Sequence, residues 1–220
     1  MLQTAFLRNS ILGACFILLG CNNTQNENTT SELPYYNTPD FTPIFVNNSS
    51  DLKQKITHSI TSFSFKNQHG KTVTEKDIEG KIHVANFIFT SCGTICPTMT
   101  RHMKKVQKEF INDKNVAILS YSVTPWIDSI ARLKRYAEDN EIKANNWHLL
   151  TGSQSEIYTL ARKSYFAEED LGFTKDSTEF LHTEHMILVD RNKRIRGIYN
   201  GTLALETEQL IKDMKILLKE

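Results

Sequence analysis

The sequence has few cysteines and almost no net charge. Four cysteines are spread over 220 residues, and 26 basic against 25 acidic side chains leave a formal net charge of +1. A nucleic-acid partner favours a strongly basic face, so this balance argues against nucleic-acid binding. No internal repeat is present. The length and the 40% hydrophobic content fit one domain with a proper core, together with tails.

Long apolar runs are also scarce. The run from Ile11 to Gly20 is too short for an ordinary membrane span, and its length and flanks are typical of a secretory signal. It ends in Leu-Leu-Gly-Cys, which resembles a bacterial lipobox, where the cysteine is lipidated and becomes the new N-terminus. We predict a lipoprotein signal peptide over residues 1–20 and lipidation at Cys21. The alternative is a plain signal peptide or a short anchor with an incidental cysteine. Acyl chains would hold the domain at a membrane of the cell envelope, outside the cytoplasm.

Residues 21–45 lack a regular apolar pattern. The polar stretch "NNTQNENTTSE" indicates a flexible tether. Leu33 to Phe45 then contains three of the five prolines and indicates an extended segment leading into the domain. We therefore assign residues 21–45 to the lipidated cysteine and tether, and residues 46–220 to the folded domain.

The rest of the chain alternates strand and helix patterns. "SFSF" followed by "NQHGKTV" predicts a β-hairpin, and Lys81 to Thr90 predicts a buried central strand. A helix is expected to begin after Cys96, with Pro97 at its start. "HMILVD" and "IRGIYNG" predict a second hairpin before a last helix. The fold class is α/β. We expect a thioredoxin-like fold, a central mixed sheet flanked by helices, with an added N-terminal β-hairpin.

Two cysteines remain for the folded body, Cys92 and Cys96 in "FTSCGTICPTMT", because Cys15 would leave with the signal and Cys21 would carry lipid. A bridge closing so short a loop stabilises a fold little, so the pair is expected to do chemistry. The alternative is a permanent disulfide in a domain that only binds a partner. The amino end of a helix favours thiolates. Thiolates serve both disulfide exchange and soft metals such as Cu(I) or zinc.

A metal site needs more than two sulfurs, and histidine is the most expected third ligand. Of the seven histidines, His58 and His69 are expected to be solvated, and His102 to face solvent beside lysine and arginine. His182 lies in the loop before the strand that begins near His185. In a thioredoxin-type fold this loop packs beside the cysteine loop, so His182 is the candidate ligand and His185 the neighbouring alternative.

One further absence bears on the chemistry. No proline follows Pro125, whereas a generic thioredoxin carries a cis-proline in the region that His182 occupies here. A peroxidase is disfavoured too, since no threonine–cysteine pattern with a nearby arginine is evident.

Three stretches, "NFIFTSCGTICPTMT", "YSVTP…D" and "HTEHMILVD", resemble the Sco/SenC family of thioredoxin-like, copper-binding proteins. The similarity covers Thr57 to Lys219. In that family two cysteines and one histidine bind copper, and members deliver copper to the Cu(A) site of cytochrome c oxidase or act in thiol redox chemistry. Carried over by position, the resemblance implies Cys92, Cys96 and His182 as ligands of Cu(I) or Cu(II).

The resemblance implies a membrane-tethered copper chaperone, whose partner is the oxidase subunit carrying the Cu(A) site or another exported cuproprotein. The alternative is a thiol–disulfide oxidoreductase that reduces cysteines of an exported partner, with Cys92 attacking and Cys96 resolving. This sequence departs from the family pattern at two positions. Thr124 replaces an acid that often precedes the proline, and Leu181 replaces an acid before the histidine, whereas Asp128 matches a second acid. The surroundings that orient the histidine are therefore in question.

Overall fold

The computed structural model describes residues 33–143, 146–167, 181 and 183–220. Strands and helices alternate along them as the sequence pattern predicts. In chain order the elements are β1 (Tyr35–Tyr36), β2 (Pro43–Ile44), α1 (Ser49–Lys55), β3 (Ser64–Asn67), β4 (Thr72–Thr74), η1 (Glu75–Ile78), β5 (Ile82–Ile88), α2 (Ile95–Phe110), β6 (Val116–Ser122), α3 (Ile130–Asp139), β7 (Trp147–Thr151), α4 (Gln154–Thr159), η2 (Leu160–Ser164), β8 (His185–Val189), β9 (Ile195–Asn200) and α5 (Ala204–Leu217).

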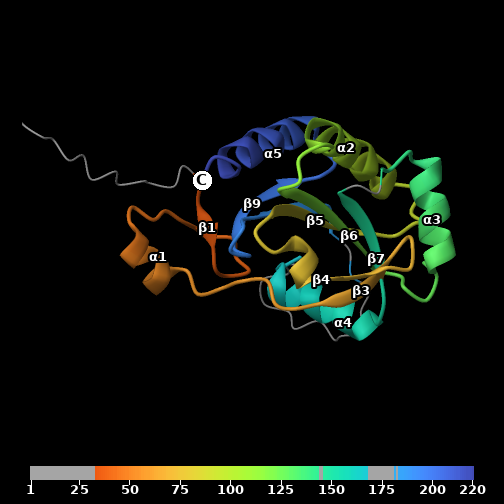
Figure 1. The fold of residues 1–220 in the computed structure, drawn as a ribbon, viewed down its shortest axis with the longest axis horizontal. Coiled ribbons are helices and arrows are strands. Elements are labelled where there is room, and N and C mark those ends of the chain that lie inside the picture. The colour runs from red at the N-terminus through yellow and green to blue at the C-terminus, as the bar shows by residue number, and fades with distance from the viewer. Residues whose placement is uncertain (1–32, 144–145, 168–180, 182) are drawn as a thin grey trace, which may run out of the picture.

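One mixed sheet forms the centre of the molecule (Figure 1). Its strand order is β2-β1-β9-β8-β5-β6-β7-β3-β4. β5, β6 and β7 are parallel, and the other neighbouring pairs are antiparallel. Every residue of β5 and β6 is buried, as expected for strands covered on both faces. The chain thus has the expected thioredoxin-like fold.

Helices cover both faces of the sheet. α2, α3 and α5 lie along one face, and α4 with η2 lies on the other (Figure 1). Met99, Met103 and Val106 of α2 are fully buried because their spacing of four and three places them on one side of the helix. They pack with Val84 of β5 and Leu210 of α5. This packing fixes the start of α2 beside the carboxyl end of β5.

The added hairpin is confirmed as β3 and β4, which pair antiparallel from Ser64↔Thr74 to Lys66↔Thr72. Gly70, with φ +75°, supplies the left-handed backbone that the turn between them needs. β3 also pairs with β7, and this pairing attaches the hairpin to the edge of the sheet.

The folded region begins earlier than the boundary expected at residue 46. β1 pairs with β9 through Tyr36↔Ile195, and β2 pairs with β1, so residues 33–45 are extended but belong to the sheet. Arg196, only 1% exposed, holds this segment by donating to the carbonyls of Leu33 and Pro34 and stacking over Tyr35 at 4.0 Å. A segment with three prolines can join a sheet because it occupies the edge.

No helix within the described ranges is both long and apolar enough to cross a membrane. The expected signal peptide and Cys21 lie outside the described residues.

Candidate functional site

The two body cysteines lie at the junction of β5 and α2. The backbone N–H of Cys92 donates to the carbonyl of Phe89 at 3.0 Å, which closes a turn with Thr90 and Ser91 at its centre. α2 begins at Ile95, so Cys96 is the second helical residue and Pro97 the third. The helix therefore begins one residue before Cys96, not after it. A proline is tolerated there because the N–H groups of the first turn have no partner within the helix.

Both thiols are free, and they differ in exposure. Cys92 is half-buried, whereas Cys96 is only 6% exposed. Thr94 occupies the N-cap position of α2 but makes no capping bond. Its hydroxyl lies 3.4 Å from the Cys92 sulfur instead. A threonine at this position usually accepts a hydrogen bond from the helix backbone, but here its hydroxyl contacts the Cys92 sulfur.

The surroundings of Cys92 favour its thiolate. Burial opposes the charge, but hydrogen bonds from the Thr94 hydroxyl, from the backbone N–H groups of Cys96 and Thr94, and from the Cys96 thiol together lower the pKa of Cys92 to about 6. These N–H groups belong to the start of α2, where they have no partner within the helix. Cys92 is therefore the reactive sulfur at neutral pH.

Cys96 has the opposite character. Burial is the main cause that raises its pKa to about 12, and the Cys92 sulfur and the charge of Asp128 act in the same direction, while the N–H of Phe89 opposes them. The pair thus combines one thiol whose pKa is lowered with one whose pKa is raised. Such a pair can exchange disulfides, and it can bind a soft metal with loss of the Cys96 proton.

The structure shows the surroundings of the two residues that depart from the family pattern, Thr124 and Leu181. Thr124 is buried and its hydroxyl donates to Asp128 at 3.0 Å. Leu181 is 1% exposed and packs in the core on the α4 side of the sheet. Thr124 therefore still supplies a polar side chain, which bonds Asp128, whereas the side chain of Leu181 has no polar group.

His182, the expected third ligand, lies outside the described residues, so its assignment stays a prediction. His185 begins β8, and its Nδ1 is buried and has no hydrogen-bond partner among the described residues. Its ring packs edge-on against Phe41, with centroids 5.7 Å apart. Within the described ranges no three histidine, cysteine or acidic side chains gather as a metal site.

Two other histidine expectations were wrong. His102 is buried, and its Nδ1 donates to the carbonyl of Gly201 at 2.8 Å, so it joins α2 to the loop before α5 and does not face solvent. His58 is half-buried and stacks on Phe166 at 4.2 Å. His69 is exposed, as expected.

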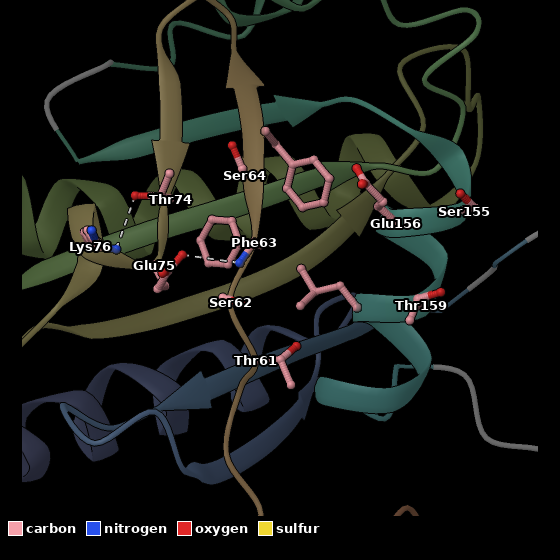
Figure 2. Close-up of a pocket in the computed structure, with 12 residues that line it drawn as sticks. Thr61, Ser62, Phe63, Ser64, Thr74, Glu75, Lys76, Ser155, Glu156 and Thr159 are labelled. Atoms are coloured by element: carbon pink, nitrogen blue, oxygen red, sulfur yellow. Dashed lines mark hydrogen bonds between the residues drawn. The ribbon is translucent and has the colours of Figure 1, made fainter.

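A hollow of about 680 Å³ lies elsewhere, between β3, the start of η1 and α4 (Figure 2). Figure 2 shows hydroxyl groups and two carboxylates, those of Glu75 and Glu156, around it. Glu75 accepts a hydrogen bond from the N–H of Phe63 at 3.4 Å. None of the described residues that line this hollow is a cysteine or a histidine, so it is separate from the cysteine site.

Several side chains around the cysteines could not be found from the sequence pattern. Thr94 is visible only as the residue between the two cysteines that could cap a helix. Thr90 and Arg132 are 42 positions apart, yet the arginine Nε donates to the threonine Oγ1 at 2.8 Å. A contact of this kind follows from the fold and leaves no local signal.

Comparison with known proteins agrees with this geometry. The SCO1/SenC family model matches residues 52–219. The chain resembles a solved SCO1/SenC family lipoprotein from Bacillus anthracis, with 34% identity, a TM-score of 0.64, and coverage of 73% of this chain and 95% of that one.

Two further solved structures are similar. One is BsSco, described as a member of the Sco family of cytochrome c oxidase assembly proteins with a disulfide switch (34% identity, TM-score 0.62, coverage 73% and 93%). The other is Bradyrhizobium japonicum ScoI with copper bound (26% identity, TM-score 0.57, coverage 73% and 99%). By its fold, its cysteine pair and the extent of these matches, the chain belongs to the SCO1/SenC family.

Proposed function

We propose that this protein is a membrane-tethered copper chaperone that delivers copper to the Cu(A) site of cytochrome c oxidase or to another exported cuproprotein. The observation that carries the proposal is the Cys92–Cys96 pair, two free thiols at the start of a helix in a chain of this family. A related ScoI is solved with copper bound, and BsSco is described as a member of a family of oxidase assembly proteins.

Copper is the cargo, and the donor set suits it. Thiolates are soft ligands that select Cu(I), and imidazole accommodates both Cu(I) and Cu(II). Cys92 and Cys96 supply the sulfurs and His182 the nitrogen. Because the pKa of Cys96 is raised to about 12, copper binding displaces its proton, and a falling pH favours release.

The tether is the part of the proposal that concerns residues 1–32. Cys21 carries the lipid, residues 1–20 are removed, and the domain stands in the cell envelope outside the cytoplasm. The related Bacillus anthracis protein is described as a lipoprotein, which supports this arrangement.

A second function, thiol–disulfide reduction of an exported partner, is favoured by the split between the two thiols. Cys92, with its pKa lowered to about 6, is suited to attack a disulfide, and the buried thiol of Cys96 is suited to resolve the mixed disulfide. The two functions share one site, since reduced sulfurs are needed for copper and a disulfide blocks it.

Anaerobic Cu(I) titration of the reduced full-length chain in detergent separates these functions. We expect one copper per chain in the wild type, loss of tight binding in Cys92→Ser and Cys96→Ser, and weakened binding in His182→Ala. His185→Ala is the matched control, because this neighbouring imidazole packs against Phe41 and is expected to leave copper binding unchanged. In cells that express the full-length chain, Cys21→Ser should release the protein from the membrane fraction.

A wild-type chain that retains no copper but turns over a disulfide substrate would replace the chaperone with the reductase. Copper binding that survives His182→Ala and is lost in His185→Ala would move the third ligand to His185.

A further inference from the structure

A fully buried carboxylate lies beside the turn that carries Cys92. The side chain of Asp128 has no exposed surface. It accepts hydrogen bonds from the hydroxyls of Thr90, Ser122 and Thr124, the last two at 2.6 and 3.0 Å. The backbone N–H of Thr90 adds a fourth bond at 3.4 Å. These donors offset the cost of removing the carboxylate from water.

Arg132 links this carboxylate to the turn. Its Nε lies 3.5 Å from Oδ1 of Asp128 and donates to Oγ1 of Thr90 at 2.8 Å, while its Nη2 donates to Oγ of Ser91. The guanidinium is planar and rigid, so it fixes the two hydroxyls relative to each other. Both central residues of the turn are therefore held by side chains that come from the β6–α3 region.

The two ends of the same turn serve the two sulfurs. Phe89, the first residue, donates its N–H to the sulfur of Cys96 and accepts a hydrogen bond from the N–H of Cys92. Cys92 is the last residue. A shift of the centre of the turn would therefore change the position of one sulfur relative to the other.

We propose that Asp128 and Arg132 are positioning residues that clamp the turn Phe89–Cys92 and so fix the two sulfurs at a separation from which they close readily to a disulfide. Holding the ends of a short loop in place lowers the entropy cost of closing it. The proposal concerns the disulfide state of the pair and does not require copper delivery.

The test is the equilibrium of the full-length, copper-free chain with dithiothreitol. Oxidised dithiothreitol takes two electrons and two protons from the cysteine thiols, and the Cys92–Cys96 bond forms as the reagent becomes a dithiol. Alkylation followed by mass spectrometry of the peptide with both cysteines gives the oxidised fraction. We expect Thr90→Val, which removes the hydroxyl at nearly constant size, to lower the equilibrium constant for disulfide formation about tenfold, or about 30 mV.

Two further variants complete the set. Asp128→Asn should lower the same constant to a similar extent, and Thr90→Ser, which keeps the hydroxyl, should restore the wild-type value. The matched control is Asp190→Asn, a buried carboxylate in the turn between β8 and β9. It should lower the melting temperature and leave the disulfide equilibrium unchanged, because it lies away from the cysteine turn.

The proposal is wrong if Thr90→Val retains the wild-type constant, if Asp190→Asn shifts it as much, or if the wild-type pair takes up no disulfide. Thr90→Val decides the matter even where Asp128→Asn does not fold. A failure of copper binding leaves this measurement intact, since no copper is present in it.

Discussion

Asp128 and Arg196 are two buried charged side chains that hold loops at opposite ends of β5. Asp128 bonds Thr90, two residues beyond the end of the strand. Arg196 follows Ile195, whose partner Val189 pairs with His83 near the start of β5. The partners of the carboxylate are mostly neutral hydroxyls, whereas the arginine also meets two carboxylates, those of Asp190 and Glu220, at 3.6 and 2.8 Å.

The contacts of Asp128 and of Arg196 therefore have different roles: the first affect the cysteine site, and the second hold distant parts of the chain together. Arg196 bonds Leu33 and Glu220, which lie 163 and 24 positions away, and so gathers the two ends of the described chain. Asp128 acts within the cysteine region, and its charge also raises the pKa of Cys96. We therefore expect the loss of Asp128 to change mainly the chemistry of the cysteine site. We expect the loss of Arg196 to change mainly the free energy of unfolding of the domain.

The largest expected effect is that of Arg196→Met. It removes the cation paired with Asp190 and Glu220 and leaves the carbonyls of Leu33 and Pro34 without this donor. Breaking a buried ion pair from one side costs about 3–5 kcal/mol, which urea unfolding measures as a lower free energy of unfolding. The alkylation rate of Cys92 should stay at the wild-type value. A loss of stability below about 1 kcal/mol would show that the two charges do not differ in this way.

An intermediate effect is expected from Thr94→Val, measured as the pH dependence of Cys92 alkylation by iodoacetamide. The rate follows the thiolate fraction, so in the wild type it should rise with pH to half its maximum near pH 6, the pKa of Cys92. Loss of the Thr94 hydroxyl removes a bond that lowers this pKa, so the midpoint should move to higher pH.

Thr202→Val is the control for this measurement, because the Thr202 hydroxyl bonds Asn200 in another loop. Cys96, with its pKa raised to about 12, should remain slow throughout the neutral range. Equal midpoints for Thr94→Val and the wild type would contradict the role given to the N-cap hydroxyl.

The smallest expected effect is that of Glu220→Gln. This carboxylate is 34% exposed, so its pairing with Arg196 is partly screened by water. We expect a loss of about 0–1 kcal/mol in urea unfolding. A loss of stability as large as that of Arg196→Met would show that the side-chain carboxylate of Glu220, and not the arginine, contributes most of the stability of this cluster.

Much of the fold could be predicted because its signals are local. The apolar run of β5 and the spacing of Met99, Met103 and Val106 mark a buried strand followed by a helix, and the cysteines lie at that junction in the structure. The β3–β4 hairpin follows from its turn residues in the same way.

What could not be predicted depends on which loops meet. His102 was expected to face solvent because charged residues flank it, but the loop before α5 covers it and accepts its hydrogen bond. The pairing of β1 with β9, and the clamp of Asp128 and Arg132 on Thr90, likewise join distant positions. His182 stays a prediction.

Arg191 and Arg196 also place the two ends of the described chain relative to the cysteine turn. Arg196 draws Leu33 to Glu220, and Arg191 bonds the carbonyl of Leu217 at 2.7 Å, so the chain enters beside its own carboxyl end. Both arginines flank the turn level with the start of β5, whereas the cysteine turn follows the far end of that strand. The described chain therefore starts near the beginning of β5, whereas the half-buried Cys92 and the buried Cys96 lie beyond the other end of that strand.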